Sequence, residues 1–128
     1  MQHYITVDLS SIVKIDNNIK ILKDTQPSFI ERSKVDEEAL DIIKYAVKAG
    51  NVLPIYVGQV APIYYTSTVA AVRKLGIPKY VLEYFTFSKL SSKEFKQKIC
   101  NKYNIIKFAF DKTKSNDVWK DYNIEVLD

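Results

Sequence analysis

The chain has few of the residues that build disulfides, metal sites and membrane spans. Its 128 residues include one cysteine, Cys100, and one histidine, His3, which excludes an internal disulfide and a histidine-based zinc site. A long uncharged run, 51–72, contains Pro54 and Pro62, which interrupt any helix before it crosses a bilayer. The amino end has neither a basic flank nor an apolar signal core. We therefore expect a cytoplasmic protein with no membrane partner, no metal and no cofactor.

What is present is the composition of an ordinary globular protein. Hydrophobic residues make up 47% of the chain and charged residues 27%, which excludes intrinsic disorder and a fibrous class. A chain of this length buries a real core but is too short for two independent ones. We expect a single domain over residues 1–128.

Periodicity predicts an α/β (α+β) fold, with a small mixed β-sheet flanked by helices. The expected strands are 5–9, 13–16 paired as a hairpin with 19–22, 54–58, 62–65, 80–87, 105–110 and an edge strand at 124–127. The first expected helix starts at 33–36 and stops at Gly50, and the second spans 69–75. A third starts at 91–94, and a short helical turn lies near 117–120. One core is expected to contain Leu40, Ile43, Val47, Ile55, Val57, Val69, Val72, Leu75 and Val81.

The order of these segments resembles the amino-terminal domain of the ParB/sulfiredoxin family. The matching positions are Val7-Asp8-Leu9, Asp36-Glu37-Glu38-Ala39-Leu40, Pro54-Ile55-Tyr56-Val57 and Ala70-Ala71-Val72-Arg73-Lys74-Leu75-Gly76-Ile77. The resemblance implies a ParB/sulfiredoxin-like core over residues 4–87. Residues 88–128 are then a basic helix–strand extension.

The chain departs from this family at its nucleotide-binding motif. The family's G-x-R-R element falls on Tyr65-Thr66-Ser67-Thr68, where the glycine, both basic residues and the catalytic cysteine of sulfiredoxin are missing. The resemblance therefore implies that the nucleotide and redox-repair chemistry of the family is lost. Two interpretations stay open for Thr66, Ser67 and Thr68: their hydroxyls hold a phosphate at a helix start, or they only cap the helix.

Positive charge is concentrated in the second half of the chain. Residues 1–60 carry seven basic and eight acidic groups, whereas residues 73–114 carry eleven basic and three acidic groups with aromatic residues between them. Basic side chains attract phosphates and exposed aromatic rings stack on bases; alternatively, the lysines form a solvated face over an aromatic core. The expected nucleic-acid contacts are Arg73, Lys74, Lys79, Phe85, Phe87, Lys93, Lys96, Lys98 and Lys102.

The leading hypothesis from the sequence is a non-enzymatic protein of viral or plasmid type that binds DNA, including single-stranded DNA, with low sequence specificity. The formation of a homodimer also stays open. Two other classes are also open. One is a nuclease or nucleotide hydrolase of the same fold, for which Asp8, Asp36 and Glu83 are scattered carboxylate candidates. The other is a protein-interaction module that uses the aromatic strand.

Overall fold

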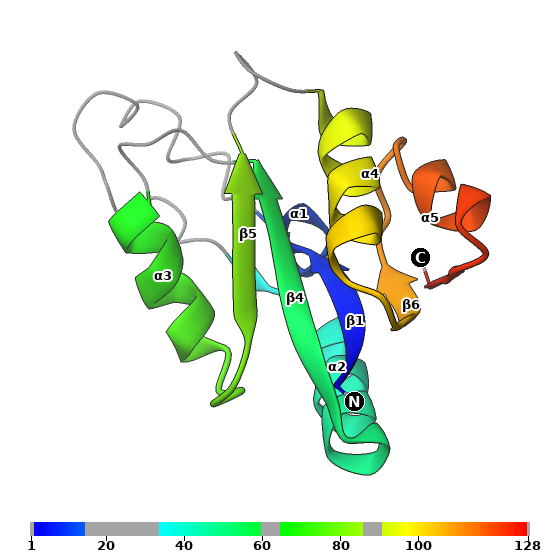
Figure 1. Ribbon diagram of the computed structural model, residues 1–128. Coiled ribbons are helices and arrows are strands. Elements are labelled where there is room, and N and C mark those ends of the chain that lie inside the picture. Colours follow the sequence, from blue (N-terminus) through cyan, green and yellow to red (C-terminus); the bar gives the residue numbers. More distant parts are fainter. Residues whose placement is uncertain (1, 15–33, 60–64, 86–90, 128) are drawn as a thin grey trace.

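The main feature of the structure is a five-stranded parallel sheet with helices on both faces (Figure 1). The computed structural model describes residues 2–14, 34–59, 65–85 and 91–127. The strands lie in the order β5-β4-β1-β6-β7. They are β1 His3–Asp8, β4 Val52–Gln59, β5 Val81–Phe85, β6 Ile106–Phe110 and β7 Glu125–Leu127. The expected α/β class is confirmed.

The sheet differs from the expected one because it is parallel throughout rather than mixed. Each neighbouring pair, β1 with β4, β1 with β6, β4 with β5 and β6 with β7, runs in the same direction. Antiparallel pairing occurs in a separate two-stranded sheet, β2 Val13–Lys14 with β3 Lys34–Val35. The hairpin partner expected at 19–22 lies outside the described residues.

Helix boundaries follow the capping chemistry of the sequence. The helices are α1 Leu9–Ile12, α2 Glu37–Gly50, α3 Tyr65–Lys74, α4 Ser92–Lys102 and α5 Asp117–Asp121. The Asp36 carboxylate caps α2 by accepting from the Ala39 amide at 3.2 Å, and Ser91 and Glu94 form the expected capping box of α4. The start of α3 is four residues earlier than expected, and most of the strand expected at 62–65 lies outside the described residues.

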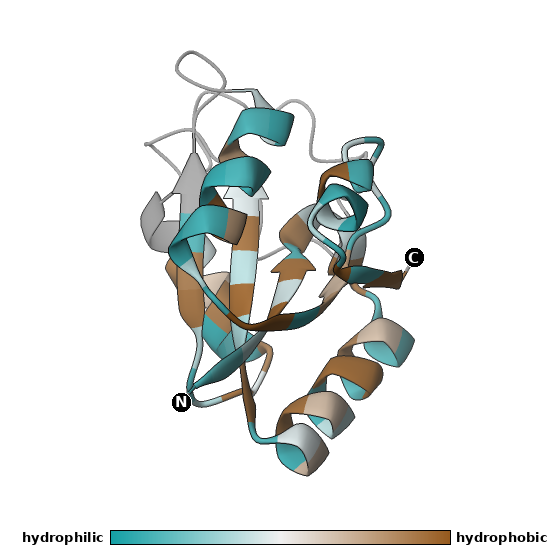
Figure 2. Ribbon diagram, turned by 45° about the vertical axis from the view of Figure 1, so that its right-hand side comes forward, coloured by the Kyte–Doolittle hydropathy of each residue, from teal (hydrophilic) through white to brown (hydrophobic). Residues whose placement is uncertain are grey.

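The sheet divides the apolar interior into two clusters, so the expectation of one core is wrong. On one face Leu40, Ile43, Val72 and Leu75 from α2 and the α3 region pack with β1 and β4. On the other face Ile55 and Val57 pack with residues of α4, α5 and β6. Alternation along each strand sends successive side chains to opposite faces, which separates residues that the sequence pattern had grouped. Figure 2 shows apolar residues along the strands and more hydrophilic residues on α4 and α5.

The order of the strands places a topological switch point at one end of the sheet. From β1 the chain proceeds to β4 and then to β5 at one edge, whereas β6 and β7 lie on the opposite side of β1. The strand order therefore reverses between β1 and β6, and open parallel sheets bind ligands outside the carboxyl ends of strands at such a point. The expected extension 88–128 supplies β6 and β7, so it completes this sheet.

None of the described helices is both long enough and apolar enough to span a bilayer.

Candidate functional site

Two matching turns occupy the carboxyl ends of the neighbouring strands β1 and β6. After β1, Asp8 Oδ1 accepts from the Ser10 amide at 3.0 Å and from the Ser10 hydroxyl at 2.5 Å. After β6, Asp111 Oδ1 accepts from the Thr113 amide at 2.8 Å and from its hydroxyl at 2.6 Å. The same local pattern, Asp-X-Ser/Thr, therefore fixes both carboxylates in the same way.

A buried lysine joins the two turns. Lys96 is on α4 and has no exposed surface. Its Nζ lies 2.6 Å from Asp111 Oδ2 and 3.3 Å from Asp8 Oδ2. It also donates to the hydroxyls of Thr113 at 2.8 Å and Ser115 at 2.7 Å. We call Asp8, Lys96 and Asp111 the carboxylate–lysine cluster.

The short helix α5 holds the Asp111 side of this cluster. Trp119 is buried in α5, and its indole Nε1 donates to Asp111 Oδ2 at 2.8 Å. The Asn116 side-chain amide donates to the Asp111 carbonyl oxygen at 3.2 Å. Asp111 is therefore bonded on both carboxylate oxygens and has a structural role in the cluster.

The two carboxylates differ in exposure and acidity. The Asp111 side chain is 1% exposed, whereas that of Asp8 is 11% exposed. Burial alone would raise the pKa of Asp111, but hydrogen bonds from Lys96, Thr113 and Trp119 outweigh it and lower that pKa. Burial raises the pKa of Asp8, and the nearby Lys96 offsets only part of this effect. Pairs of carboxyl groups with pKa values pushed apart are typical of sites with divided roles.

The cluster holds one carboxylate, that of Asp8, against a fixed positive charge at the carboxyl end of β1. Asp8 is its most exposed member, with a side chain that is 11% exposed, and Lys96 Nζ lies 3.3 Å from its Oδ2 atom. Among residues 2–14, 34–59, 65–85 and 91–127, no three His, Cys, Asp or Glu side chains gather as a metal site. A divalent cation here therefore needs most of its ligands from water and from the ligand itself.

Other candidate reactive groups are less suited to chemistry. Burial raises the pKa of the Cys100 thiol to about 11, so its nucleophilic thiolate is scarce at neutral pH. Asp36 Oδ2 lies 3.7 Å from Lys112 Nζ, and Glu83 Oε2 accepts from Lys102 at 2.8 Å. Of the three carboxylates considered from the sequence, only Asp8 belongs to the cluster.

The expectation that Lys96 contacts DNA from the protein surface is wrong. Lys96 lies on the inner side of α4 and its ammonium group is enclosed by four oxygen partners. Lys93 and Lys98 are exposed on α4, although Lys93 Nζ lies 3.8 Å from Asp117. Lys102 is 64% exposed and paired with Glu83.

The remaining basic residues lie on the opposite side of the sheet. Arg73, Lys74 and Lys79 are exposed. Their neighbours in the sequence, Val72, Leu75 and Ile77, pack in the same apolar cluster as α2, on one face of the sheet. By contrast, α4 packs against the other face. A single flat surface therefore cannot present both groups of basic residues.

Of the hydroxyl and aromatic residues expected to bind phosphate or bases, the structure describes the side chain of Thr68 alone. Thr68 is buried inside α3, three residues after its first residue, so it does not stand at the helix start as expected. The side chains of Thr66, Ser67 and Phe85, and all of Phe87, lie outside the described residues. Their proposed contacts stay predictions.

The sequence contained signals for the cluster that the interpretation missed. Asp8-Leu9-Ser10 and Asp111-Lys112-Thr113 each follow an apolar strand, and parallel strands bring their carboxyl ends to the same edge. Lys96 precedes Ile99 by three residues, which places it on the apolar face of its helix. A lysine at such a position predicts a buried partner of opposite charge.

Comparisons with known proteins support the fold. A chain in the solved structure of the Pnkp1/Rnl/Hen1 RNA repair complex aligns with 98% of this chain at a TM-score of 0.77 and 12% identity. The alignment covers 42% of that chain, so this protein spans less than half of its length. No protein-family model and no curated protein matches the sequence. At 12% identity the likeness shows the fold alone, and the ParB/sulfiredoxin resemblance stays a prediction.

Proposed function

We propose that this protein hydrolyses phosphate esters at the carboxylate–lysine cluster, with Asp8 as the group that attacks phosphorus. The observation that carries the proposal is the position of Lys96 Nζ, 2.6 Å from Asp111 and 3.3 Å from the more exposed Asp8. These groups meet where the strand order reverses, the usual ligand position in an open parallel sheet. A carboxylate that is held in place by a fixed cation and is more exposed than its partner suits the role of an attacking group.

The proposed reaction has two steps. Asp8 Oδ2 attacks phosphorus, the bond to the alkoxide breaks, and the alkoxide takes a proton from water. A water molecule then attacks the same phosphorus, the bond between phosphorus and Asp8 Oδ2 breaks, and inorganic phosphate and the free Asp8 carboxylate are released. The protons of this water go to the phosphate and to solvent. Ser10 holds Asp8 Oδ1, and the enclosed Lys96 holds Asp8 Oδ2 at 3.3 Å, so both residues position the attacking carboxylate.

The first substrate class to test is a nucleic acid with a terminal phosphate. The basic charge of residues 73–114 favours polyanionic substrates. The structural neighbour is a chain of an RNA repair complex. A small aryl phosphate tests the chemistry without nucleic-acid binding. A cytoplasmic location is part of this proposal.

Wild-type protein is expected to release inorganic phosphate from p-nitrophenyl phosphate and faster from RNA with a 3′- or 5′-terminal phosphate. Mg²⁺ is expected to accelerate the reaction because it binds to one or two carboxylates together with substrate phosphates. A colorimetric phosphate assay with and without Mg²⁺ measures both effects. No release from any substrate under either condition would refute the proposed function.

Binding of nucleic acid without catalysis is the second candidate, in line with the leading hypothesis from the sequence. The observation that favours it is the exposed basic surface of α4, with Lys93 and Lys98. Lys93→Gln combined with Lys98→Gln is expected to reduce the slope of log affinity against log salt by about 1.8 on duplex DNA, since each phosphate contact contributes about 0.9. Fluorescence anisotropy over a salt series measures it.

The matched control for the α4 variant is Lys48→Gln combined with Lys107→Gln, which removes the same charge from exposed positions on other elements. Equal slopes for the two double variants would show that α4 makes no specific phosphate contact. Thermal unfolding of both variants is expected to match the wild type, because exposed charges contribute little to stability.

A further inference from the structure

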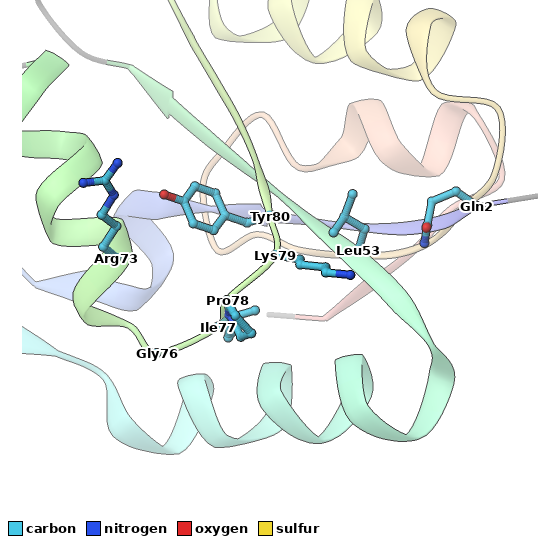
Figure 3. A pocket seen from close by; sticks show the side chains of 8 residues that line it. All are labelled: Gln2, Leu53, Arg73, Gly76, Ile77, Pro78, Lys79 and Tyr80. Atoms are coloured by element: carbon cyan, nitrogen blue, oxygen red, sulfur yellow. The ribbon is translucent and has the colours of Figure 1, made fainter.

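A second concave site lies at the opposite end of the sheet from the carboxylate–lysine cluster. It is a groove of about 890 Å³ between the carboxyl end of α3, the segment that leads into β5, and the start of β4 (Figure 3). Gln2, just before β1, lines the groove, whereas Asp8 ends β1. Six residues of extended chain separate them by about 20 Å. The groove is therefore independent of the cluster.

Three basic side chains surround this groove, each from a different element. Arg73 comes from α3 and Lys79 from the segment before β5, and both line it. Lys44 comes from α2, and its Nζ lies 3.4 Å from the position that a Cβ on Gly76 would take. All three are exposed. Within the part of the chain that the structure describes, none of them forms an ion pair with a carboxylate.

Helix electrostatics explain only part of this arrangement. A basic residue in the last turn of α3 offsets the negative end of the helix dipole, which accounts for Arg73. It does not account for Lys44 and Lys79, which belong to other elements. Three cations around one groove, without acidic partners among the described residues, create a positive potential that favours an anionic ligand.

The floor of the groove adds apolar and aromatic surface. Leu53, Ile77 and Pro78 line it, and Tyr80 forms one wall. The Tyr80 ring is braced by Tyr56, with ring centroids 5.7 Å apart in an edge-on arrangement. Figure 3 shows the hydroxyl end of Tyr80 pointing toward the Arg73 side chain. Gly76 has a φ of 84°, a conformation that favours glycine.

We propose that this groove binds a nucleotide unit, either free or within a single strand of nucleic acid. Phosphates contact Arg73 and Lys79, which lie on either side of Tyr80 (Figure 3). Lys44 lies at the rim, and the base and sugar lie against Tyr80 and the apolar floor. Cations beside an aromatic ring are the combination by which proteins hold single strands. The inference does not depend on the proposed hydrolysis.

Arg73→Gln combined with Lys79→Gln tests the groove. Wild type is expected to bind a fluorescent single-stranded 12-mer with a salt slope that is about 1.4 larger in magnitude than that of the variant, since each phosphate contact on a single strand contributes about 0.7. The control is Lys107→Gln combined with Lys120→Gln, which removes the same charge elsewhere and is expected to keep the wild-type slope. Equal slopes for wild type and the groove variant would overturn the inference.

Competition distinguishes a free nucleotide from a strand. If a nucleoside monophosphate displaces the 12-mer from the wild type but inorganic phosphate does not, the groove takes a free nucleotide; if only unlabelled oligonucleotide competes, it takes a strand. Displacement by inorganic phosphate at equal concentration would overturn the role of the base. The same titrations with Asp8→Asn separate the two sites. Retained binding with loss of hydrolysis in this variant supports both sites, and groove binding by a wild type that hydrolyses nothing supports the groove alone. Wild-type hydrolysis without groove binding refutes the groove alone.

Discussion

Replacing Asp111 with alanine is expected to lower the free energy of unfolding by about 3–5 kcal/mol, the usual cost of removing one partner of a buried ion pair. The reason is that Lys96 has no exposed surface and loses its 2.6 Å carboxylate partner. The indole of Trp119 loses its acceptor in the same change. Denaturant unfolding followed by far-UV circular dichroism measures the loss. Trp119 is the single tryptophan, so its fluorescence reports on the same region.

The matched control is Asp117→Ala, which removes a carboxylate 3.8 Å from Lys93 in a pair whose side chains are 54% and 59% exposed. Its ion pair is expected to contribute less than about 1 kcal/mol. Losses of equal size in the two variants would contradict the burial argument. Should Asp111→Ala fail to fold, Lys96→Met combined with Asp111→Asn tests the same point, because removing both charges is expected to restore folding.

Replacing Asp8 with asparagine is expected to lower the rate of phosphate release on the order of 10⁴-fold, as loss of an essential attacking group does. Asparagine has nearly the same shape, and Lys96 keeps its closer partner Asp111, so the fold is expected to be retained. The measurement is kcat for p-nitrophenyl phosphate beside denaturant unfolding of the same preparation. Unchanged kcat in a folded Asp8→Asn variant would exclude Asp8 as the attacking group.

The stability of Asp8→Asn relative to wild type is expected to depend on pH. Because burial raises the pKa of Asp8 above its ordinary value of 3.8, its ionisation costs stability as pH rises from 3.8 through the raised pKa. The variant lacks this cost and becomes more stable relative to wild type across that window. Asp111 acts in the opposite direction, since its lowered pKa gives stability that is lost as pH falls through that pKa. A stability difference that is constant from pH 3 to 8 would contradict the assignment for Asp8.

Much of the fold could be predicted from the sequence because local signals decide it. The capping box at Ser91 and Glu94 and the apolar strand 106–110 were both identified from spacing alone. The parallel sheet could not be predicted in the same way. Strand partners depend on contacts between distant residues, and a pattern such as that of β4 is compatible with a parallel or an antiparallel neighbour.

The candidate site was harder to predict because it consists of residues from distant segments. In the sequence Asp8 is one of three scattered carboxylate candidates, and the chemistry of Lys96 predicts a surface position because lysine is mostly exposed in proteins. Its burial is a consequence of tertiary packing, in which α4 lies over β1 and β6 and brings Lys96 between two acids. The positive charge of Lys96 does not indicate whether its side of α4 faces the sheet or the solvent.

The position of β1 in the sheet also determines when the proposed site comes into existence. The first strand of the chain becomes the central one, with β4 on one side and β6 on the other. Asp8 therefore meets Asp111 only after about a hundred residues of intervening chain have been brought together, at an entropic cost of about 4 kcal/mol. A chain still emerging from the ribosome carries an ordinary solvated aspartate at position 8 until α4 and β6 have been synthesised and have docked. The proposed hydrolysis therefore requires the complete fold, and incomplete chains are expected to release no phosphate.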